Sequence, residues 1–359
     1  MAAIRWRKDR AAAIRLRMNA PNRLRLDGAA LVENWRTLAR MSGCAACGAA
    51  VKADGYGLGA TAVVKRLADA GCRDFFVATW AEAAALARPD LSLSVLHGVR
   101  AADMPIATRI AARPVLSTPA QIQRWREAGM GACDVMVDTG MNRLGVAPDD
   151  IASGLLDGLQ VETLMSHLAS AEEAGASINE RQRAALRSIA DRSGARRVSL
   201  ANSAGVALGS DYAFDLTRPG IALYGGVPCP RLSGLIRPVA TIQAEVLQRR
   251  EVPAGGRVGY NLTWTAKRDS SVAVVNLGYA DGYRRAFSNC GTAFVGDVAV
   301  PVIGRVSMDL TAVDVTSLDV SEGDWISFDS DLAHASAASD VSQYELLTGL
   351  GRRFDRIWS

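Results

Sequence analysis

Residues 74–98 read DFFVATWAEAAALARPDLSLSVLHG, and this stretch carries the pattern that decides the fold. The runs 74–79 and 93–98 are short, apolar and strand-like. Between them, 80–89 repeats apolar residues at three- and four-residue intervals and ends at a proline. A strand, a helix and a second strand in succession are typical of a βαβ unit. We therefore expect the two strands to lie parallel in one sheet, with the helix on its face.

The same alternation recurs over the first two thirds of the chain, where helix-like stretches such as 60–71 and 119–129 separate short strand-like runs. Eight such runs predict a TIM-like (β/α)8 barrel within an α/β protein. An open, doubly wound sheet is the alternative, but the sequence lacks the G-x-G-x-x-G phosphate turn common in that fold. The eight runs are GAAVKA (48–53), DFFVAT (74–79), LSVLHG (93–98), RPVLS (113–117), DVMVDTG (134–140), VETLMSH (161–167), RVSLANS (197–203) and AFDLTRPG (213–220).

The pattern changes after Pro238, where strand-like runs follow one another across short Gly- and Asp-containing turns. We expect a smaller, mainly-β domain there, with no substantial helix before YELLTGLGRRF near the end. The run NRLRLDG (22–28) alternates apolar and polar residues and is a candidate strand of that domain. The predicted organisation is a basic N-terminal extension (1–21), a barrel (22–240) and a C-terminal β domain (241–359).

Composition narrows the class of protein. Of the 359 residues, 49% are apolar, and no run approaches the ~18 apolar residues that a membrane span needs. The net charge of +4 comes largely from arginines in the first 25 residues, and the remaining chain is slightly acidic. We expect a soluble, cytoplasmic protein without membrane or nucleic-acid partners.

The six cysteines include one C-x-x-C, at Cys44 and Cys47, without a second pair at zinc spacing. We therefore expect buried free thiols and no metal site.

The sharpest local feature is AAVKADGYGLGA (49–60), where an apolar strand ends in Lys52 and three glycines follow. Active sites of barrels collect at the C-terminal ends of the strands, which is where Lys52 falls. Burial favours the neutral amine that Schiff-base chemistry requires. A lysine that extends outward to solvent is the alternative, and the spacing alone does not decide between the two.

The chain resembles the alanine racemase family, which depends on pyridoxal phosphate (PLP). VKADGYGLG is similar to the PLP-lysine motif of that family, and six further motifs follow in the family's order. These are DTGMNRLG (138–145), SHLAS (166–170), ANSAG (201–205), RPGIALYG (218–225), GYADGY (278–283) and GRVSMD (304–309). Each motif alone is weak, but the ordered set is specific.

The resemblance implies a two-base racemase that interconverts L-alanine and D-alanine. Lys52 would hold PLP covalently and act as the base on one face of the substrate, and Tyr279 would act on the other. Arg143 and the backbone amide of Met308 would bind the substrate carboxylate. The other implied cofactor contacts are Tyr56, Trp80, His167, Asn202, Ser203, Arg218, Gly220 and Ile221.

Two of these implied roles have mechanistic consequences. Arg218 would face the pyridine nitrogen, and because arginine keeps its proton, that nitrogen would stay unprotonated. His167 would link Arg218 to Tyr279 in a hydrogen-bonded chain that lowers the pKa of the phenol. In the family, this tyrosine and the residue equivalent to Met308 come from the partner subunit. The resemblance therefore implies a homodimer with shared active sites.

The chain departs from the family's pattern at two places. A lysine, often carbamylated, commonly stands seven residues before the substrate-binding arginine, where this chain has Met136. The C-terminal phosphate-binding tyrosine is also missing, since 352–354 reads RRF. A racemase with broader specificity, a non-catalytic PLP-binding barrel protein and a decarboxylase of the same fold are the alternatives. The β domain with GYADG argues against the second, and RPGIALYG argues against the third.

Overall fold

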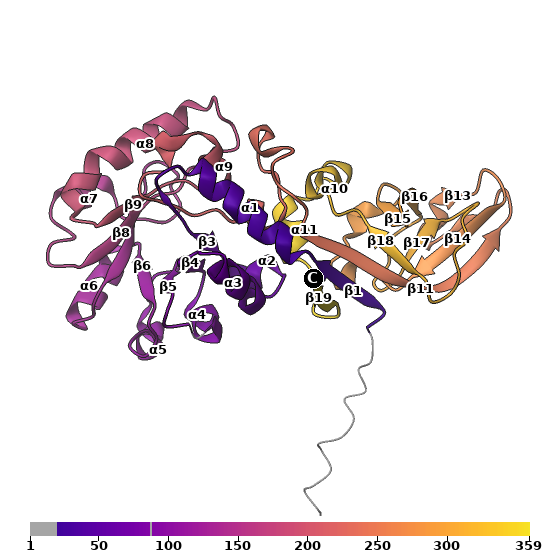
Figure 1. The fold of residues 1–359 in the computed structure, drawn as a ribbon, viewed down its shortest axis with the longest axis horizontal. Coiled ribbons are helices and arrows are strands. Elements are labelled where there is room, and N and C mark those ends of the chain that lie inside the picture. Colours follow the sequence, from indigo (N-terminus) through magenta and orange to yellow (C-terminus); the bar gives the residue numbers. More distant parts are fainter. Residues whose placement is uncertain (1–19, 87) are drawn as a thin grey trace, which may run out of the picture.

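The computed structural model describes residues 20–86 and 88–359, and most of the predicted N-terminal extension lies outside this part. The first domain contains a seven-stranded parallel sheet in chain order. Helices α3 to α8 surround this sheet (Figure 1). Its strands are β3 (Ala49–Ala50), β4 (Asp74–Val77), β5 (Ser92–Val95), β6 (Arg113–Leu116), β7 (Cys133–Met136), β8 (Val161–Met165) and β9 (Arg197–Ser199). The strand-like runs of the sequence therefore become parallel strands, as predicted.

The eighth run forms β10 (Leu216–Thr217), which closes the ring. It pairs in parallel with β2 (Ala46–Cys47), which immediately precedes β3. On its other side, the Arg218 amide donates a hydrogen bond of 2.8 Å to the Ala201 carbonyl, beyond β9. The predicted (β/α)8 barrel is thereby confirmed.

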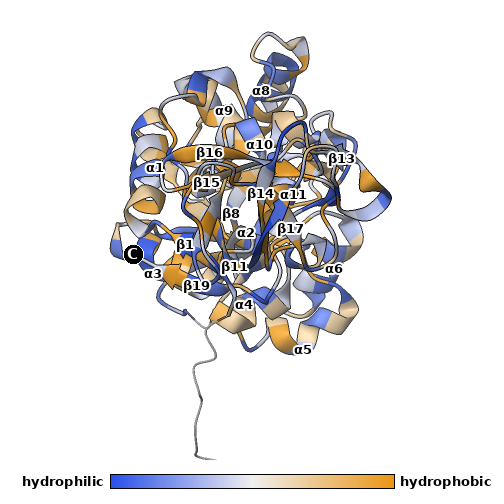
Figure 2. Ribbon diagram, turned by 90° about the vertical axis from the view of Figure 1, so that its right-hand side faces the viewer, coloured by the Kyte–Doolittle hydropathy of each residue, from blue (hydrophilic) through white to orange (hydrophobic). Residues whose placement is uncertain are grey.

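The longer helices of the barrel are amphipathic, and Figure 2 shows apolar and polar colours side by side along α1 and α8. In α1, the buried residues recur at helical spacing and include Ala30, Leu31 and Leu38. The helices of the barrel are α1 (Gly28–Met41), α2 (Lys52–Tyr56), α3 (Ala60–Asp69), α4 (Trp80–Leu86), α5 (Met104–Ala107), α6 (Pro119–Glu127), α7 (Pro148–Ala152), α8 (Ser177–Ala190) and α9 (Ser203–Ala207). The apolar residues of these helices thus belong to the hydrophobic core.

The second domain is built on a mainly antiparallel sheet of eight strands, in the order β14-β17-β16-β15-β18-β11-β1-β19. The long strand β11 also pairs with β14, so that six of the strands close on themselves. The strands are β1 (Asn22–Leu26), β11 (Ala240–Val252), β14 (Ser270–Val275), β15 (Thr292–Val295), β16 (Val298–Ile303), β17 (Thr311–Asp314), β18 (Trp325–Phe328) and β19 (Asp355–Trp358). A separate hairpin joins β12 (Arg257–Val258) and β13 (Trp264–Thr265).

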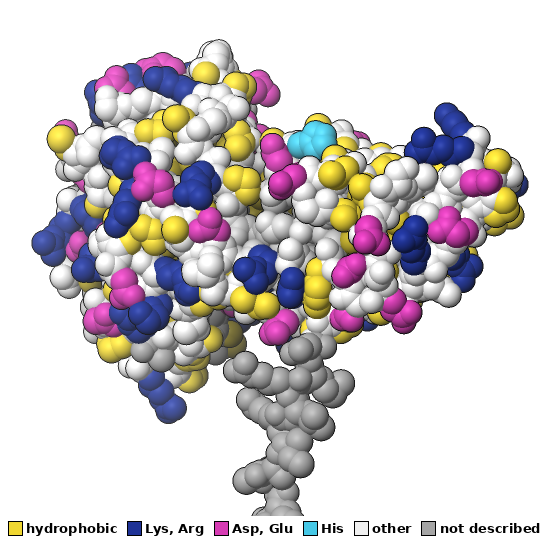
Figure 3. Space-filling model, turned by 45° about the vertical axis from the view of Figure 1, so that its right-hand side comes forward, with side chains coloured by type: hydrophobic (Ala, Val, Ile, Leu, Met, Phe, Trp, Pro, Cys, Tyr) yellow, Lys and Arg dark blue, Asp and Glu magenta, His cyan; other side chains and the backbone are white. Residues whose placement is uncertain are grey.

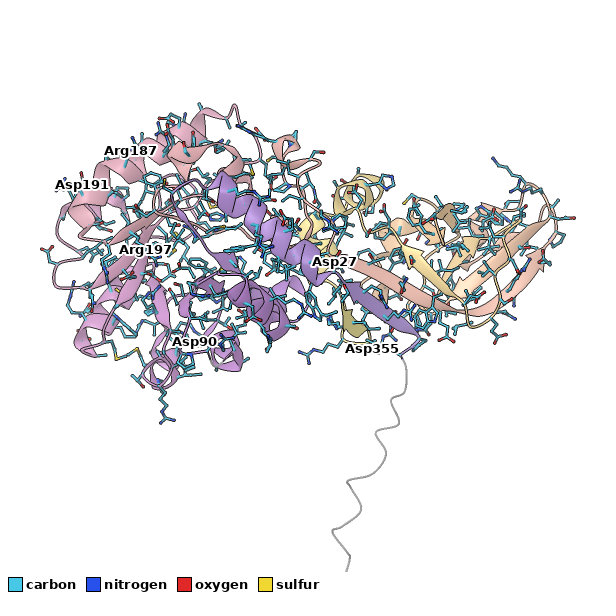
Figure 4. The ribbon with its side chains drawn as sticks, in the orientation of Figure 1. Asp27, Asp90, Arg187, Asp191, Arg197 and Asp355 are labelled. Atoms are coloured by element: carbon cyan, nitrogen blue, oxygen red, sulfur yellow. The ribbon has the colours of Figure 1, made fainter. Side chains whose placement is uncertain are left out.

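The two ends of the described chain meet in this sheet. As expected from its alternation, NRLRL forms β1, which pairs antiparallel with β11 and parallel with β19. Asp27 then begins α1, since its carboxylate accepts a 2.8 Å hydrogen bond from the Ala30 amide. Figure 4 shows Asp27 and Asp355 near the junction of the two domains. The first strand of the chain therefore connects the β domain directly to the barrel.

Two predictions about the C-terminal region are wrong. Residues 332–339 form a helix, α10 (Leu332–Ser339), because its alanine-rich sequence favours a helix and the Asp331 carboxylate caps its first amides. The helix in YELLTGLGRRF is also shorter than expected. It is α11 (Gln343–Thr348), after which the chain turns into β19.

Acidic and basic side chains alternate over the face shown in Figure 3 and do not separate into large single-sign patches. Among the described residues, no helix is both long enough and apolar enough to cross a membrane.

Candidate active site

A cavity of about 660 Å³ opens at the C-terminal ends of the barrel strands. Nine of the residues singled out by the sequence line it, and they come from the segments that follow β3, β7, β8, β9 and β10. They are Lys52, Tyr56, Arg143, His167, Asn202, Ser203, Arg218, Gly220 and Ile221. The fold therefore brings together side chains that are up to 169 positions apart in the chain.

Lys52 enters the cavity at the start of an unusual turn. Ala53, Asp54, Gly55 and Tyr56 all have positive φ, between 53° and 63°, so the chain makes a short left-handed turn. This conformation costs roughly 1–2 kcal/mol for each non-glycine residue. Glycine suits position 55 for a second reason, because a Cβ there would lie 3.1 Å from the backbone of Ala60, which is a tight contact. Backbone strain of this kind is found where a functional group must be held in one direction.

The cavity favours the neutral form of the Lys52 amine. Burial lowers its pKa below the ordinary value, as does the positive charge of Arg143 and, less strongly, that of Arg218. The carboxylate of Glu82 opposes this shift. A neutral amine is the form that can attack a carbonyl group or accept a proton.

Arg218 lines the cavity and is buried, and its hydrogen-bonding partners are neutral. Its guanidinium donates to the Ser199 hydroxyl and to the Ser166 carbonyl. Burial lowers the pKa of Arg218 to about 10, partly opposed by the charge of Asp134. The group therefore remains a cation at neutral pH: it donates hydrogen bonds but does not give up a proton to its partners.

His167 lines the same cavity, and its backbone carbonyl accepts a 2.9 Å hydrogen bond from the Gln182 side chain. Burial, followed by the positive charges of Arg218, Arg143 and Lys52, lowers the pKa of His167 to about 3. The imidazole is thus neutral at physiological pH. It is suited to relay a hydrogen bond, not to carry a positive charge.

A polar cradle lies on the side of the cavity formed by the loops after β9 and β10. The Ser203 hydroxyl accepts hydrogen bonds from the amides of Gly220 (2.9 Å) and Ala222 (3.2 Å). The Tyr56 phenol reaches the same place, because a Cβ on Gly220 would collide with it. Burial raises the pKa of Tyr56, so this phenol stays a hydrogen-bond donor. The Ser203 hydroxyl, the Tyr56 phenol and the backbone at 220–221 thus gather at one wall of the cavity, and hydroxyl and amide groups of this kind fit a phosphate group.

The loop that carries Arg143 is held by Asp138. Its carboxylate accepts hydrogen bonds from the amides of Gly140 (2.8 Å), Met141 (2.9 Å) and Arg143 (3.0 Å). Burial raises the pKa of Asp138, but these amide bonds together lower it below its ordinary value. Met136 lines the cavity with Arg143 and offers it no negatively charged acceptor.

Comparison with known proteins agrees with this geometry. Two family models match the chain: alanine racemase, N-terminal domain, over residues 26–228 and alanine racemase, C-terminal domain, over 239–358. The chain belongs to the alanine racemase family. It is 42% identical to the alanine racemase of Acidiphilium cryptum, over 95% of this chain and 99% of that protein. It is 40% identical to the catabolic alanine racemase of Agrobacterium fabrum, over 94% and 92% of the two chains.

A solved structure of the alanine racemase family extends the similarity to three dimensions. The crystal structure of alanine racemase from Bartonella henselae with covalently bound pyridoxal phosphate superimposes with a TM-score of 0.87. The two chains are 34% identical, and the match covers 94% of this chain and 99% of that one.

Three residues that the resemblance to alanine racemases singled out do not line the cavity of this chain. Trp80 is buried outside the lining, because its indole donates a 2.9 Å hydrogen bond to the Gly98 carbonyl. Tyr279 and Met308 lie together in the second domain, where the Tyr279 amide donates to the Ser307 carbonyl at 3.0 Å. Their exposed fractions are 42% and 54%. Within one chain, therefore, Tyr279 is not brought next to Lys52.

The structure also places in the cavity a tyrosine that the sequence analysis missed. Tyr344 of α11 lines it, with its ring 6.5 Å from the ring of Tyr56. Burial and the charge of Glu172 raise the pKa of Tyr344 to about 12. It stands at the cavity wall although the C-terminal tyrosine of the alanine racemase pattern is absent from 352–354. Nothing in YELL indicates that α11 reaches the barrel, because this contact joins two domains.

Proposed function

We propose that this protein interconverts L-alanine and D-alanine with PLP as cofactor. One observation carries the proposal: a lysine amine with a lowered pKa shares a single cavity with a phosphate-like cradle and a buried arginine. The family to which the chain belongs supports the same reaction, as does the cofactor named for the Bartonella relative.

The residues of the cavity fit PLP at both ends. Tyr56, Ser203 and the amides of Gly220 and Ile221 would hold the phosphate, and Asn202 orients the segment by capping α9 through the Gly205 amide at 2.8 Å. When bound, PLP withdraws electrons from the amino acid and acidifies its α-hydrogen. Arg218 would meet the pyridine nitrogen. Because this guanidinium keeps its proton at neutral pH, it would leave the nitrogen unprotonated and so disfavour transamination.

Racemisation needs proton transfer on both faces of the α-carbon. Lys52 would anchor the cofactor and exchange the proton on one face, and Arg143 would bind the substrate carboxylate. Tyr279 would exchange the proton on the other face. Neutral His167 would transmit the field of Arg218 to this phenol through a hydrogen bond.

The active form is proposed to be a homodimer with two shared sites. Tyr279 and Met308 are exposed in a single chain, although each has an expected role at the cavity. Other large apolar side chains of the same domain are also exposed, notably Tyr260 (70%), Leu262 (47%) and Leu310 (40%). A second copy that covers this surface would bring Tyr279 to the partner's Lys52.

We place this activity in the cytoplasm. All six cysteines are free thiols, and Cys47, Cys72, Cys133 and Cys229 are buried. Burial raises the pKa of Cys47 to about 11, which keeps its thiol protonated and unreactive. Free thiols are typical of a reducing compartment.

The decisive experiment is a circular-dichroism racemisation assay with added PLP on L-alanine, L-serine, L-lysine and L-arginine. Alanine is expected to react fastest; equal rates for the others would favour the broader racemase instead. Lys52→Ala should remove the visible absorbance of the lysine-bound cofactor and reduce turnover by several orders of magnitude. Lys65→Ala is the matched control, since Lys65 pairs with Asp69 on the exposed face of α3. A Lys52→Ala protein that kept both signals would contradict the proposal.

A further inference from the structure

Glu82, near the start of α4, joins two loops at the mouth of the barrel. Its Oε1 atom accepts a hydrogen bond of 2.8 Å from the Ala53 amide, the first residue after Lys52. Its Oε2 atom accepts from the amides of Ala78 (2.7 Å) and Thr79 (3.3 Å), which follow β4. One carboxylate therefore connects the segment after β3 to the segment after β4.

Only part of this arrangement belongs to the helix cap. The Thr79 hydroxyl accepts a 3.2 Å hydrogen bond from the Glu82 amide, and Glu82 returns a bond to the Thr79 amide. These two bonds form the capping box of α4. The bond to Ala53 crosses 29 positions of sequence and does nothing for the cap. It needs an explanation of its own.

The explanation lies in the left-handed turn of residues 53–56. Inside the turn, the Gly57 amide donates to the Ala53 carbonyl at 2.9 Å, and the Gly59 amide donates to the Asp54 carbonyl at 2.8 Å. The Ala53 amide has its acceptor outside the turn, in Glu82. Hydrogen bonds to an ionised acceptor are stronger than neutral ones. Glu82 thus fixes the peptide between Lys52 and Ala53. It thereby holds Ala53 in a left-handed conformation that L-residues otherwise avoid.

We propose that Glu82 is a positioning residue for Lys52, holding the left-handed turn so that the amine points into the cavity. This inference rests on the proposed role of Lys52 as the residue that binds PLP. Glu82 does not touch the reacting atoms. It acts through the peptide between Lys52 and Ala53, and through the β4 loop against which that peptide is held.

The test compares Glu82→Ala and Glu82→Gln with the wild-type protein. Apoenzyme is mixed with PLP, and the visible absorbance of the lysine-bound cofactor is followed over time. Because a displacement of about 1 Å costs about a hundredfold in a positioned reaction, Glu82→Ala should form this adduct roughly ten- to a hundredfold more slowly. The kcat for alanine should fall similarly, and the KM should change less than about threefold. Glu82→Gln keeps one acceptor oxygen, so its rates should lie between the two.

Asp331→Ala is the matched control, since Asp331 also bonds backbone amides at a helix start, but in the β domain. It should lower the melting temperature without slowing adduct formation. If Glu82→Ala loses stability and still forms the adduct at the wild-type rate, Glu82 is only a cap and the inference is wrong. If Glu82→Ala does not fold, a wild-type adduct rate in Glu82→Gln overturns the inference and a slower rate supports it. A wild-type protein without any adduct would instead contradict the proposed function.

Discussion

Gly220→Ala is expected to weaken PLP binding, because the phosphate cradle has no room for a methyl group. A Cβ at this position would lie 3.0 Å from Cζ of Tyr56, and closer still to its hydroxyl oxygen. The phenol cannot easily yield, since Tyr56 is only 6% exposed and its ring stacks on Tyr224 with centroids 4.6 Å apart. Tyr224 is itself held by a 2.8 Å hydrogen bond to the Ala50 carbonyl. Either the phenol or the 220–221 backbone must therefore shift.

The expected magnitude follows from the cost of such overpacking, which is typically about 1–3 kcal/mol. If this cost appears in cofactor binding, the dissociation constant of PLP should rise about fivefold to about 150-fold, at about 1.4 kcal/mol per factor of ten. Titration of apoenzyme with PLP, followed by absorbance, measures this constant. Gly131→Ala is the control, because no atom lies within 4 Å of a Cβ at that position.

A double variant isolates the contact that carries the effect. Tyr56→Phe removes the nearest atom, so Gly220→Ala should weaken PLP binding less in the Tyr56→Phe background than in the wild-type background. Strictly additive effects, or a Gly220→Ala protein that binds PLP like the wild type, would show that this glycine does not keep the cradle open.

Three further predictions follow from the site. Tyr279→Phe should slow racemisation by roughly 10²- to 10⁴-fold, and mixing it with Lys52→Ala protein should restore some activity if sites are shared. No recovery after demonstrated subunit exchange would count against a shared site. His167 has a pKa of about 3 when folded, against an ordinary value of 6.5. Below about pH 6.5 the unfolded chain therefore binds a proton that the folded chain does not take up until about pH 3, and stability should fall as the pH decreases through this range. Melting curves at about pH 7.5 and about pH 5 should show a smaller difference for His167→Gln apoenzyme than for wild type. Finally, Arg143 is exposed in the single chain and Met136 beside it in the cavity offers no negative charge. We expect a chloride ion to bind Arg143 in place of such a group, so that activity in halide-free and bicarbonate-free buffer rises when chloride is added. Indifference to chloride would assign the role to protein acceptors, and a response to bicarbonate would place the modified lysine elsewhere.

Much of the fold follows from patterns that extend over only a few residues. The alternation of strand-like and helix-like segments predicted the barrel. Of the two strands that the ends of the described chain add to the β-domain sheet, 22–26 was recognised from its alternation and 355–358 was not. The missed helix, α10, has an alanine-rich composition and an aspartate cap, both of which are local signals that the sequence analysis did not use. The early end of α11 is different, because β19 forms only where β1 offers it an edge.

The residues of the candidate site likewise fall into those that local motifs predicted and those whose place depends on the tertiary structure. Motif order identified Lys52, Arg218 and the segments of the cradle, and the fold brings all of them to one cavity. Trp80 was expected in the cavity wall because the resemblance places it where the family usually has a leucine beside the cofactor, but its indole donates a hydrogen bond to the Gly98 carbonyl. Tyr344 was not expected there at all. Its place depends on where α11 lies against the turn 52–56, and no pattern within α11 contains that information.

The sequence by itself determined the class of the fold, the family and the order of the functional segments along the chain. Helical spacing, strand alternation and glycine turns depend on neighbours within a few residues, so they can be recognised without the structure. Only the tertiary structure decided which side chains share the cavity, which charges lower the pKa values of Lys52 and His167, and that Glu82 holds the turn beside the lysine. These properties depend on burial and on distances between residues far apart in the chain. Such distances are set when the loops of separate strands meet at one end of the barrel.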